Sequence, residues 1–490
     1  MVFNDADFII IDGRPGGVGN APDLKIENLA TTGTNSNTIA LTNGATNNII
    51  RFVHAVNNTQ NTAGPRTIVL LTSSTVGNSN NLITRCKIEG GRSGVGIAGS
   101  SSVPNDSNTI SNCEIFNWGY AGIWLVSGAL STNIDSCKIY QTVGVNNTIV
   151  SGIIMATMTG GTYNIRKNWI YDLQSSSTSS STVIRGIYAA GPAAGSTFNV
   201  QNNMVSNTLD NSNVQTITGI EFLGSNAYTA NIYYNTTRIG GNHTSGTSGA
   251  TTSAGIRIGA SSLTLNMKNN ICINYRTGGA VYHIGFVLVS TTGVLNVDYN
   301  CYFANGTNSF HAYWGGVGYN NLSDYKTAAS PNEQNTVFAN VNLVSATDLH
   351  LAGTSIGDTN LKGTPISGIT TDFDNDLRNP IAPYKGADEG SVPLLTKINS
   401  NIAYNYYLSQ NFPNPFNPST TIKFSIAKDG FVTLKVFDIL GRVVSELISQ
   451  DMKAGEYQIN FNANNLSSGI YFYRLSSDNF SETKQMIIIK

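Results

Sequence analysis

Four side chains in this sequence could contact a sugar chain. Trp124, Tyr188, Glu221 and Arg257 each fill the third place of a recurring glycine–apolar–variable–apolar pattern. In a strand whose apolar residues point inward, that third place points outward. Aromatic rings can stack on sugars, and carboxylate or guanidinium groups can bond hydroxyls and carboxylates. These four are therefore the candidate substrate-binding residues.

Two interpretations of this set are open. A lyase acting on uronic acids needs a basic group that acidifies the sugar α-proton and a base that removes it, and Arg257 with Tyr188 could serve. The other interpretation is a surface ion pair beside solvated rings, which contributes little. The paired acids of a glycosidase cannot be assigned, because Asp135, Glu221 and Asp298 fall in different repeats. Catalytic residues therefore remain unassigned.

Alternating acids suggest one metal site. Asp372, Asp374 and Asp376 are spaced like the start of a calcium loop, without the glycine and glutamate that complete an EF-hand. Ca²⁺ is the cofactor that this spacing allows. The alternative is a turn in which acidic side chains cap backbone N–H groups. The five histidines show no ligand spacing.

A second outward column is expected at Lys87, Glu114 and Lys138, where the sign of the charge alternates from repeat to repeat. Opposite charges on neighbouring strands stabilise strand register modestly. This column therefore needs no ligand to explain it.

A repeat of about 31 residues positions all these side chains. The pattern apolar–x–x–Asn/Cys–x–apolar spans 214 residues over seven intervals, and its fourth place is filled in turn by Cys86, Cys113, Cys137, Asn168, Asn203, Asn235, Asn270 and Asn300. The glycine pattern runs in phase with it, and Gly96-Ile97 is expected to open that series. Both patterns alternate with period two, which indicates strands, and Gly, Asn, Ser and Thr clusters separate them.

Two or three short strands per repeat predict an all-β chain with a parallel β-solenoid over residues 1–300. Each coil buries its apolar face only by stacking on the next, about 4.8 Å away. Stacked asparagine amides can bond from coil to coil. On these motifs the chain resembles the right-handed parallel β-helix family of secreted bacterial proteins, which includes pectate-lyase-like enzymes and many surface proteins. The resemblance implies the fold and leaves the activity open.

The cysteines fit this register as free thiols. Cys86, Cys113 and Cys137 take the asparagine position, so their side chains should stack in parallel at the coil spacing, whereas a disulfide prefers Cβ atoms about 3.8 Å apart. Cys272 is expected to point inward and Cys301 outward. An odd number of cysteines also cannot be fully paired.

The period fades after Asn300. Residues 301–390 are expected to cap the solenoid, because such arrays need capping ends. They close with Asp372–Arg378 and Gly386–Glu389, a pairing similar to the ending of bacterial β-helix surface domains. Residues 391–403 are interpreted as a linker.

Residues 404–490 alternate as short strands with glycine turns, which predicts a small antiparallel β-sandwich. Within them, Gln410–Pro418, Val436–Arg442, Leu466–Tyr471 and a basic end at Lys490 look like the C-terminal sorting domain of the bacterial type IX secretion system. The resemblance implies contact with that secretion machinery, export across the outer membrane, removal of the domain, and anchoring or release of the rest. The alternative is a terminal sandwich that serves as a binding module.

Composition limits the partners. Only 12% of residues are charged, the net charge is −1, and no run of like charges occurs. This argues against nucleic acid and against an electrostatic membrane anchor, and no apolar run is long enough for a transmembrane helix. The type IX route begins with a signal peptide, and Met1-Val-Phe-Asn-Asp lacks its basic start, so we expect the signal and first coils to lie outside this sequence.

The sequence therefore predicts a secreted or cell-surface protein, associated with the outer membrane after export. Non-enzymatic glycan binding or adhesion is the favoured function, since only Tyr188, Glu221 and Arg257 converge. A polysaccharide lyase or glycoside hydrolase of the pectate-lyase-like fold is the alternative, and a purely structural filament or sheath is the third.

Overall fold

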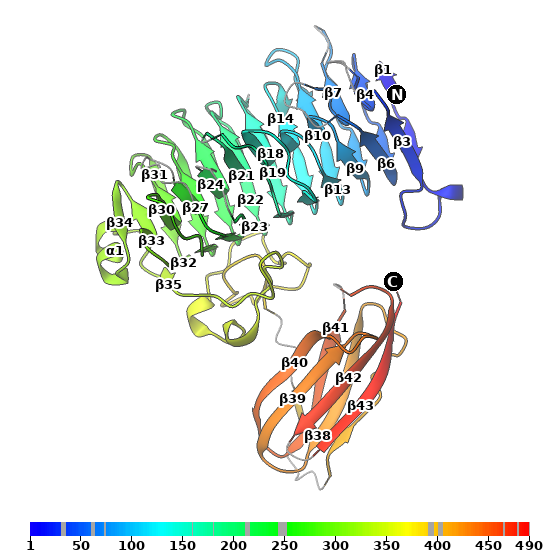
Figure 1. The fold of residues 1–490 in the computed structure, drawn as a ribbon, viewed down its shortest axis with the longest axis vertical. Coiled ribbons are helices and arrows are strands. Elements are labelled where there is room, and N and C mark those ends of the chain that lie inside the picture. Colours follow the sequence, from blue (N-terminus) through cyan, green and yellow to red (C-terminus); the bar gives the residue numbers. More distant parts are fainter. Residues whose placement is uncertain are drawn as a thin grey trace. The chain divides into compact units, whose positions relative to one another are not determined.

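A computed structural model describes the chain except residues 31–35, 60–63, 73–74, 159, 180, 211–215, 244–251, 391–395, 400–404, 464–465, 478–479 and 490. It contains two compact units, Met1–Glu389 and Gly390–Lys490, and both are drawn in Figure 1. Among the described residues, no helix has the length and apolarity needed to cross a membrane.

The first unit is a parallel β-solenoid of three sheets, whose coils Figure 1 shows stacked from the blue N-terminus to the yellow-green end. Sheet A contains β1 (Val2–Asn4), β4 (Ile39–Thr42), β7 (Ile68–Leu71), β10 (Ser93–Ala98), β14 (Ala121–Leu125), β18 (Ile149–Ala156), β21 (Val183–Ala190), β24 (Thr216–Leu223), β27 (Thr252–Ile258), β30 (Tyr282–Leu288), β33 (Ser309–Trp314) and β34 (Val317–Tyr319). Sheet B contains β2 (Ile10–Asp12), β5 (Ile49–Arg51), β8 (Leu82–Thr84), β12 (Thr109–Ser111), β16 (Asn133–Asp135), β19 (Thr162–Arg166), β22 (Thr197–Gln201), β25 (Thr229–Tyr233), β28 (Thr264–Lys268) and β31 (Val294–Asp298). Sheet C contains β3 (Leu24–Asn28), β6 (Val53–Asn57), β9 (Lys87–Gly90), β13 (Glu114–Phe116), β17 (Lys138–Tyr140), β20 (Trp169–Tyr171), β23 (Met204–Thr208), β26 (Thr236–Gly240), β29 (Ile271–Asn274), β32 (Cys301–Ala304) and β35 (Val337–Phe338).

Short elements lie between and beyond these strands. They are a two-stranded sheet of β11 (Asn105–Asp106) and β15 (Ala129–Leu130), the 3-10 turns η1 (Pro15–Gly17), η2 (Gly353–Ser355) and η3 (Thr359–Leu361), and the helix α1 (Leu322–Ala329). The parallel pairing continues past Asn300, because β32 pairs with β29 and β33 with β30.

Aliphatic side chains of the period-two pattern fill the space between the sheets. Ile88, Ile115, Ile139, Ile170 and Val205 pair in register along sheet C, and all five are fully buried. Burial of each such side chain contributes about 1.5–3 kcal/mol of transfer free energy. A slip of one residue would turn the whole file to solvent, so the apolar pattern determines the register.

The glycines of sheet A are required by close packing. A Cβ built on Gly186 would lie 2.4 Å from the carbonyl oxygen of Gly219 and 2.2 Å from a methyl carbon of Val205. Both distances are well inside van der Waals contact. A residue without a side chain is therefore needed at this position of the coil.

Gly94, and not Gly96 as expected, opens this series. Strand pairing places Val95 beside Ile123 and Gly96 beside Trp124. Gly96 therefore occupies the outward third place of its strand. Both glycines sit in the same alternating pattern, so the sequence alone did not distinguish the two registers.

A file of asparagine amides closes the corner between sheets B and C, as the sequence predicts. The members of the file are Asn168, Asn203, Asn235, Asn270 and Asn300. From Asn203 onward, each asparagine oxygen accepts both the backbone N–H and the side-chain amide of the asparagine one coil earlier, at 2.9–3.0 Å. All five side chains are completely buried. The amides thus satisfy one another where no water reaches.

Cysteines extend this file toward the N-terminus. All five cysteines are free thiols, as expected. The thiol of Cys137 donates to the carbonyl of Ile110 in the preceding coil, at 3.7 Å. The amide of Asn203 makes the equivalent bond to the carbonyl of Ile165, at 2.8 Å. Cysteine therefore replaces the donor function of asparagine at the corner.

The helix α1 and the turn after it close the C-terminal end of the solenoid. Asn300, the last amide of the file, donates its backbone N–H to Thr336 Oγ1 at 2.9 Å. The buried carboxylate of Glu333 accepts from the hydroxyls of Tyr302 and Tyr325 at 2.7 and 2.8 Å, and burial raises its pKa. Polar groups of this turn therefore replace the missing next coil.

Residues 339–389, the covering segment, pack against the outer face of sheet C. Arg378 donates to Asn202 Oδ1 at 2.8 Å, and its guanidinium carbon lies 3.8 Å from the centre of the Tyr234 ring. The N–H of Ala387 donates to Thr236 Oγ1 at 2.8 Å. Cys301, which points away from the solenoid core, is fully buried under this segment.

The second unit is an antiparallel β-sandwich, as expected, but it includes the strand Thr396–Asn399 from the stretch 391–403 that was interpreted as a linker. One sheet contains β36 (Thr396–Asn399), β41 (Gly455–Asn462), β38 (Ser419–Ile426) and β37 (Tyr407–Leu408), and the other contains β40 (Val443–Met452), β39 (Gly430–Phe437), β42 (Gly469–Ser477) and β43 (Phe480–Ile488). Ile422 and Phe424 of the first sheet share one buried cluster with Val432 and Leu434 of the second. The alternating strands thus present one face of each sheet to a common core.

Replacement of Asn203 by alanine tests the importance of the buried file. Asn203→Ala leaves the N–H groups of Asn168 without their acceptor, and a buried orphaned group costs about 1–3 kcal/mol. We expect the free energy of unfolding, measured in urea, to fall by at least that amount.

Asn199→Ala, on the same coil, is the matched control. The Asn199 amide donates to Asn164 in a half-exposed row on the outside of sheet B, where water can replace it. We expect a loss below about 1 kcal/mol. Equal losses in the two variants would show that burial does not govern the file.

Candidate functional site

Strand pairing places the predicted binding residues in one row on the outer face of sheet A. Trp124 pairs with Ile154, and Ile154 with Tyr188. Tyr188 in turn pairs with Glu221, and Glu221 with Arg257. Tyr188, Glu221 and Arg257 are therefore neighbours on consecutive coils, whereas buried Ile154 separates Trp124 from them. We call the whole series, Trp124, Ile154, Tyr188, Glu221 and Arg257, the outer row.

Glu221 lies inside the row and does not face solvent. Its side chain is 1% exposed, and its two oxygens accept from Arg185 Nε and Arg257 Nη1. Both guanidinium groups are partly exposed above it, at 14% and 28%. The arginines, and not the carboxylate, are thus the groups of this ion triplet that can meet a ligand.

Tyr188 lies beside the same triplet. The guanidinium carbon of Arg185 is 4.0 Å from the centre of its ring, so one ring face is in contact with a cation. Burial raises the pKa of the Tyr188 hydroxyl. The hydroxyl therefore stays protonated and can donate a hydrogen bond.

Three residues that the sequence did not single out surround Trp124. The guanidinium carbons of Arg66 and Arg92 lie 4.7 and 4.3 Å from the centre of its ring, and Tyr120 packs edge-on at 5.4 Å between ring centres. Arg66 lies between two strands and Arg92 directly before β10, so neither belongs to the repeating outward position. The sequence indicated the position of Arg66 only indirectly, because Gly96 has no side chain to fill the outward place of its coil.

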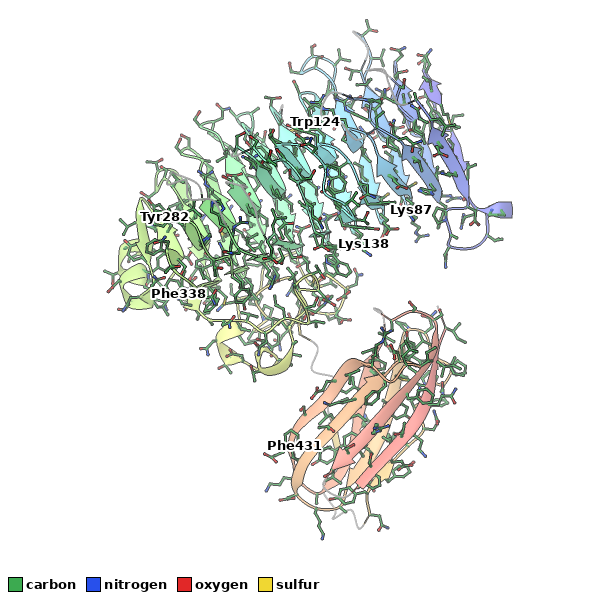
Figure 2. All side chains as sticks on the ribbon, viewed as in Figure 1. Lys87, Trp124, Lys138, Tyr282, Phe338 and Phe431 are labelled. Carbon is green, nitrogen blue, oxygen red and sulfur yellow. The ribbon has the colours of Figure 1, made fainter. Side chains whose placement is uncertain are left out.

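The Lys87, Glu114 and Lys138 column is in register on sheet C, and Figure 2 labels both lysines there and Trp124 on sheet A. Each charge contacts an aromatic ring beside the column. Lys138 Nζ lies 5.2 Å from the Tyr140 ring, and the Tyr140 hydroxyl donates to Glu114 at 2.7 Å. Phe116, Tyr140 and Tyr171 also stack on one another, with centres 5.6 and 5.1 Å apart. Tyr140, the middle ring, therefore has both faces covered by stacking.

Two of the three aspartates proposed as metal ligands, Asp372 and Asp374, make different kinds of contact. Asp372 accepts the backbone N–H groups of Asp374 and Asp376 through one oxygen and that of Glu389 through the other, all at 2.9 Å. Burial raises the pKa of Asp372 to about 6. Its side chain therefore caps the loop of the covering segment, as in the alternative interpretation of this motif.

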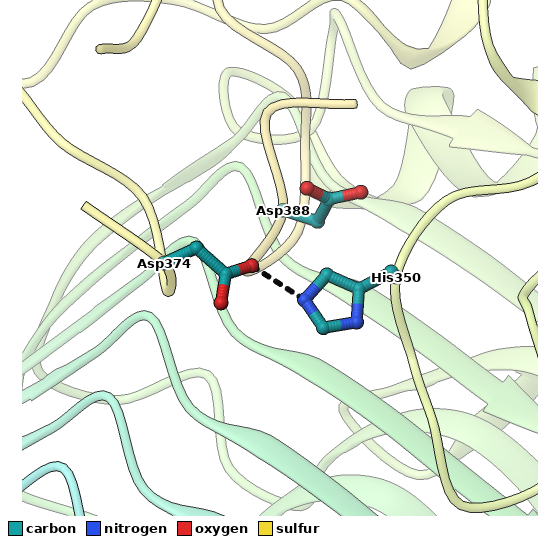
Figure 3. Close-up of side chains that lie close together, drawn as sticks. All are labelled: His350, Asp374 and Asp388. Atoms are coloured by element: carbon teal, nitrogen blue, oxygen red, sulfur yellow. Dashed lines mark hydrogen bonds and ion pairs between the residues drawn. The ribbon is translucent and has the colours of Figure 1, made fainter. Parts of the chain in front are cut away.

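Asp374 instead joins His350 and Asp388, which come from separate parts of the covering segment (Figure 3). One ligand atom from each of the three lies within 4.8 Å of the others, the sole such group of three among the described residues. His350 Nε2 contacts Asp374 Oδ2 at 2.6 Å, and its Nδ1 contacts Asp348. Long-range folding creates this cluster, so histidine spacing in the sequence did not reveal it.

The cluster has the composition of a metal centre, but its contacts suit a protonated histidine. Burial disfavours the imidazolium, while hydrogen bonds to Asp348 and Asp374 and the charge of Asp388 favour it and raise the pKa of His350 to about 11. With both ring nitrogens donating to carboxylates, the imidazolium ties the loops of the covering segment together.

The contacts of its ionisable groups limit the chemistry that the outer row could perform. A glycosidase needs two carboxyl groups about 5–9.5 Å apart, and the one carboxylate of the row already accepts from two arginines. A lyase needs a base, and the raised pKa of Tyr188 opposes that role. What the row offers is aromatic surface and guanidinium donors along the solenoid axis.

Comparison with known proteins identifies the second unit. Residues 410–490 match the family of secretion system C-terminal sorting domains, which confirms the assignment to the type IX secretion system. No curated protein matches the chain.

Among solved structures, the enzymatically active domain of tailspike protein 4 of bacteriophage CBA120 is similar, with 13% identity and a TM-score of 0.16. The match covers 92% of this chain and 64% of that one, so the chain spans less than two thirds of its length. A likeness this low carries no argument about activity.

The pH dependence of stability tests the role of His350. A pKa raised from 6.5 to about 11 stabilises the folded chain below about pH 6.5, and this contribution is lost as the pH rises toward 11. We expect the free energy of unfolding of the wild type, relative to His350→Gln, to fall by about 1.4 kcal/mol per unit between about pH 7 and pH 10.

His311→Gln is the control, because burial lowers the pKa of His311, so its imidazole is neutral from pH 7 to pH 10. The difference in the free energy of unfolding between this variant and the wild type should not change over this pH range. If added Zn²⁺ stabilises the wild type and not His350→Gln at neutral pH, the cluster holds a metal and the imidazolium assignment is wrong.

Proposed function

We propose that the solenoid binds polysaccharide through the outer row of sheet A and leaves it chemically unchanged. The row is carried to the outside of the cell, because the type IX sorting domain directs the protein to the cell surface or the medium. A polysaccharide ligand at that location matches both the position of the protein and the chemistry of the row.

One observation carries the proposal. Aromatic and guanidinium side chains occupy the same position of every second coil, so Trp124, Tyr188 and Arg257 lie in one row along the solenoid axis, with buried Ile154 and Glu221 between them. A linear sugar chain presents apolar ring faces and hydroxyl groups at regular intervals, and such a line of groups is complementary to it. The buried ion triplet holds Arg185 and Arg257 in fixed positions, which reduces the entropy lost on binding.

The favoured role is binding and not catalysis for a chemical reason. Proton abstraction needs a free base, and the Glu221 oxygens are both bonded to arginines. The arginines that would stabilise an enolate-like intermediate in a lyase are therefore present without a partner to generate it.

Removal of the aromatic rings should weaken binding of polysaccharide. Trp124→Ala and Tyr188→Ala each remove one stacking surface, worth about 0.5–1.5 kcal/mol, so the dissociation constant should rise roughly 2- to 10-fold in each. Binding is measured by calorimetry with the glycans that a glycan array selects.

Tyr140→Ala is the matched control, since Tyr140 belongs to the stacked rings on sheet C. It should leave the affinity unchanged. An assay for unsaturated or reducing sugar products accompanies each titration. Products that disappear in Arg257→Ala would establish a lyase, and a protein that binds no glycan on the array would overturn the proposal.

A further inference from the structure

Two arginines lie at one end of the outer row, and neither has an acidic partner among the described residues. Arg66 and Arg92 both contact the Trp124 ring. No carboxylate forms an ion pair with either among the residues that the structure describes, and the Nε atoms of both are buried without a hydrogen-bond partner. The indole Nε1 of Trp124 is buried and unpartnered in the same way.

Arg66 reaches the row because Gly96 leaves a place vacant. A Cβ on Gly96 would lie 2.1 Å from Arg66 Cδ, so the arginine side chain runs across the glycine and takes the outward position of that coil. Arg92 approaches from the residue directly before β10. The chain thus brings two cations to one indole ring by two separate routes.

Without a bound ligand, this arrangement of two arginines costs free energy. Burial and the neighbouring charge of Arg92 lower the pKa of Arg66 to about 10, and burial also lowers that of Arg92. Two like charges that are partly removed from water repel each other. Their unpartnered donors add the cost of desolvation without a replacement bond.

The other end of the same row shows how such a pair is stabilised. Arg185 and Arg257 also lie together, and there the protein supplies Glu221, which bonds to both. Arg66 and Arg92 resemble the two arginines of that triplet, but no described carboxylate lies between them. A carboxylate or sulfate from outside would complete it, with bidentate bonds to the guanidinium groups.

We propose that Arg66, Arg92 and Trp124 form an anion subsite that selects acidic glycans, those carrying uronate carboxylates or sulfate esters. The inference rests on the proposed function and specifies its ligand. The acidic group lies at the Arg66 and Arg92 end, and the chain continues along the row past Tyr188 toward Arg257. The subsite strand β14 and the Glu221 strand β24 are three coils apart, about 14 Å at the usual strand spacing.

The test compares acidic glycans with neutral counterparts of the same backbone. Full-length protein is titrated with a uronate polymer, its carboxyl-reduced form and a sulfated form. We expect the wild type to bind both acidic polymers more tightly than the reduced one. In Arg66→Gln/Arg92→Gln, affinity for the acidic polymers should fall roughly 10-fold or more, since bonds to charged groups are lost, while affinity for the reduced polymer is unchanged.

The matched control is Lys87→Gln/Lys138→Gln, which removes the same charge from sheet C and should preserve the preference for acidic polymers. Circular dichroism and urea unfolding check the fold of each variant. Arg66→Lys keeps the charge and loses the planar fork, so it should lose part of the preference even if the double variant folds poorly.

The outcomes separate the two proposals. Equal wild-type affinity for acidic and reduced polymers, or an unchanged preference in the double variant, overturns the anion subsite and leaves glycan binding intact. Absence of binding to every polymer overturns both. If free sulfate or vesicles with anionic lipid bind as tightly as the acidic polymers and lose binding in the double variant, the subsite recognises small anions or lipid and the assignment to glycans is wrong.

Discussion

The structure of the solenoid depends on the satisfaction of buried polar groups by their equivalents one coil away. At the corner between sheets B and C, each asparagine amide from Asn203 to Asn300 accepts two N–H groups of the preceding coil and donates to the backbone of that coil. The corner is buried, so water cannot replace these bonds, and each missing partner would leave an orphaned group. Coils must therefore stack in register, and the outward positions of successive coils must line up as rows.

The same constraint explains what happens where the stack ends. Asn300 is the last asparagine of the file among the described residues, and Thr336 and Glu333 accept the hydrogen bonds from its backbone N–H and its side-chain amide. The covering segment also satisfies buried polar groups, on the side of the solenoid. Arg378 donates to the corner residue Asn202 and to the carbonyl of Gly386, and Asp372 accepts the backbone N–H of Glu389. These bonds hold the loop around residue 372 in place.

The outward positions of sheet A are free of this constraint, and there the chain holds side chains whose arrangement suits a ligand. Arg185 and Arg257 both pair with Glu221, whereas no described carboxylate forms an ion pair with Arg66 or Arg92. Since the sorting domain directs the protein out of the cell, the proposed anionic ligand is one that would be met outside the cell. An acidic polysaccharide combines that charge with rings that can stack on Trp124 and Tyr188.

The sequence by itself determined the repeating features of this protein. The stacking of the coils, the file from Cys86 to Asn300, the outward row from Trp124 to Arg257 and the sorting domain could all be predicted, because each is a local pattern that recurs or a specific sequence motif. The exception is the coil of Gly94 and Gly96, where the pattern fits two registers. The tertiary structure alone decided the burial of Glu221 between Arg185 and Arg257, the approach of Arg66 over Gly96, and the meeting of His350 with Asp374 and Asp388. These contacts depend on where turns and the covering segment place side chains in space, and no periodic signal in the chain encodes that placement.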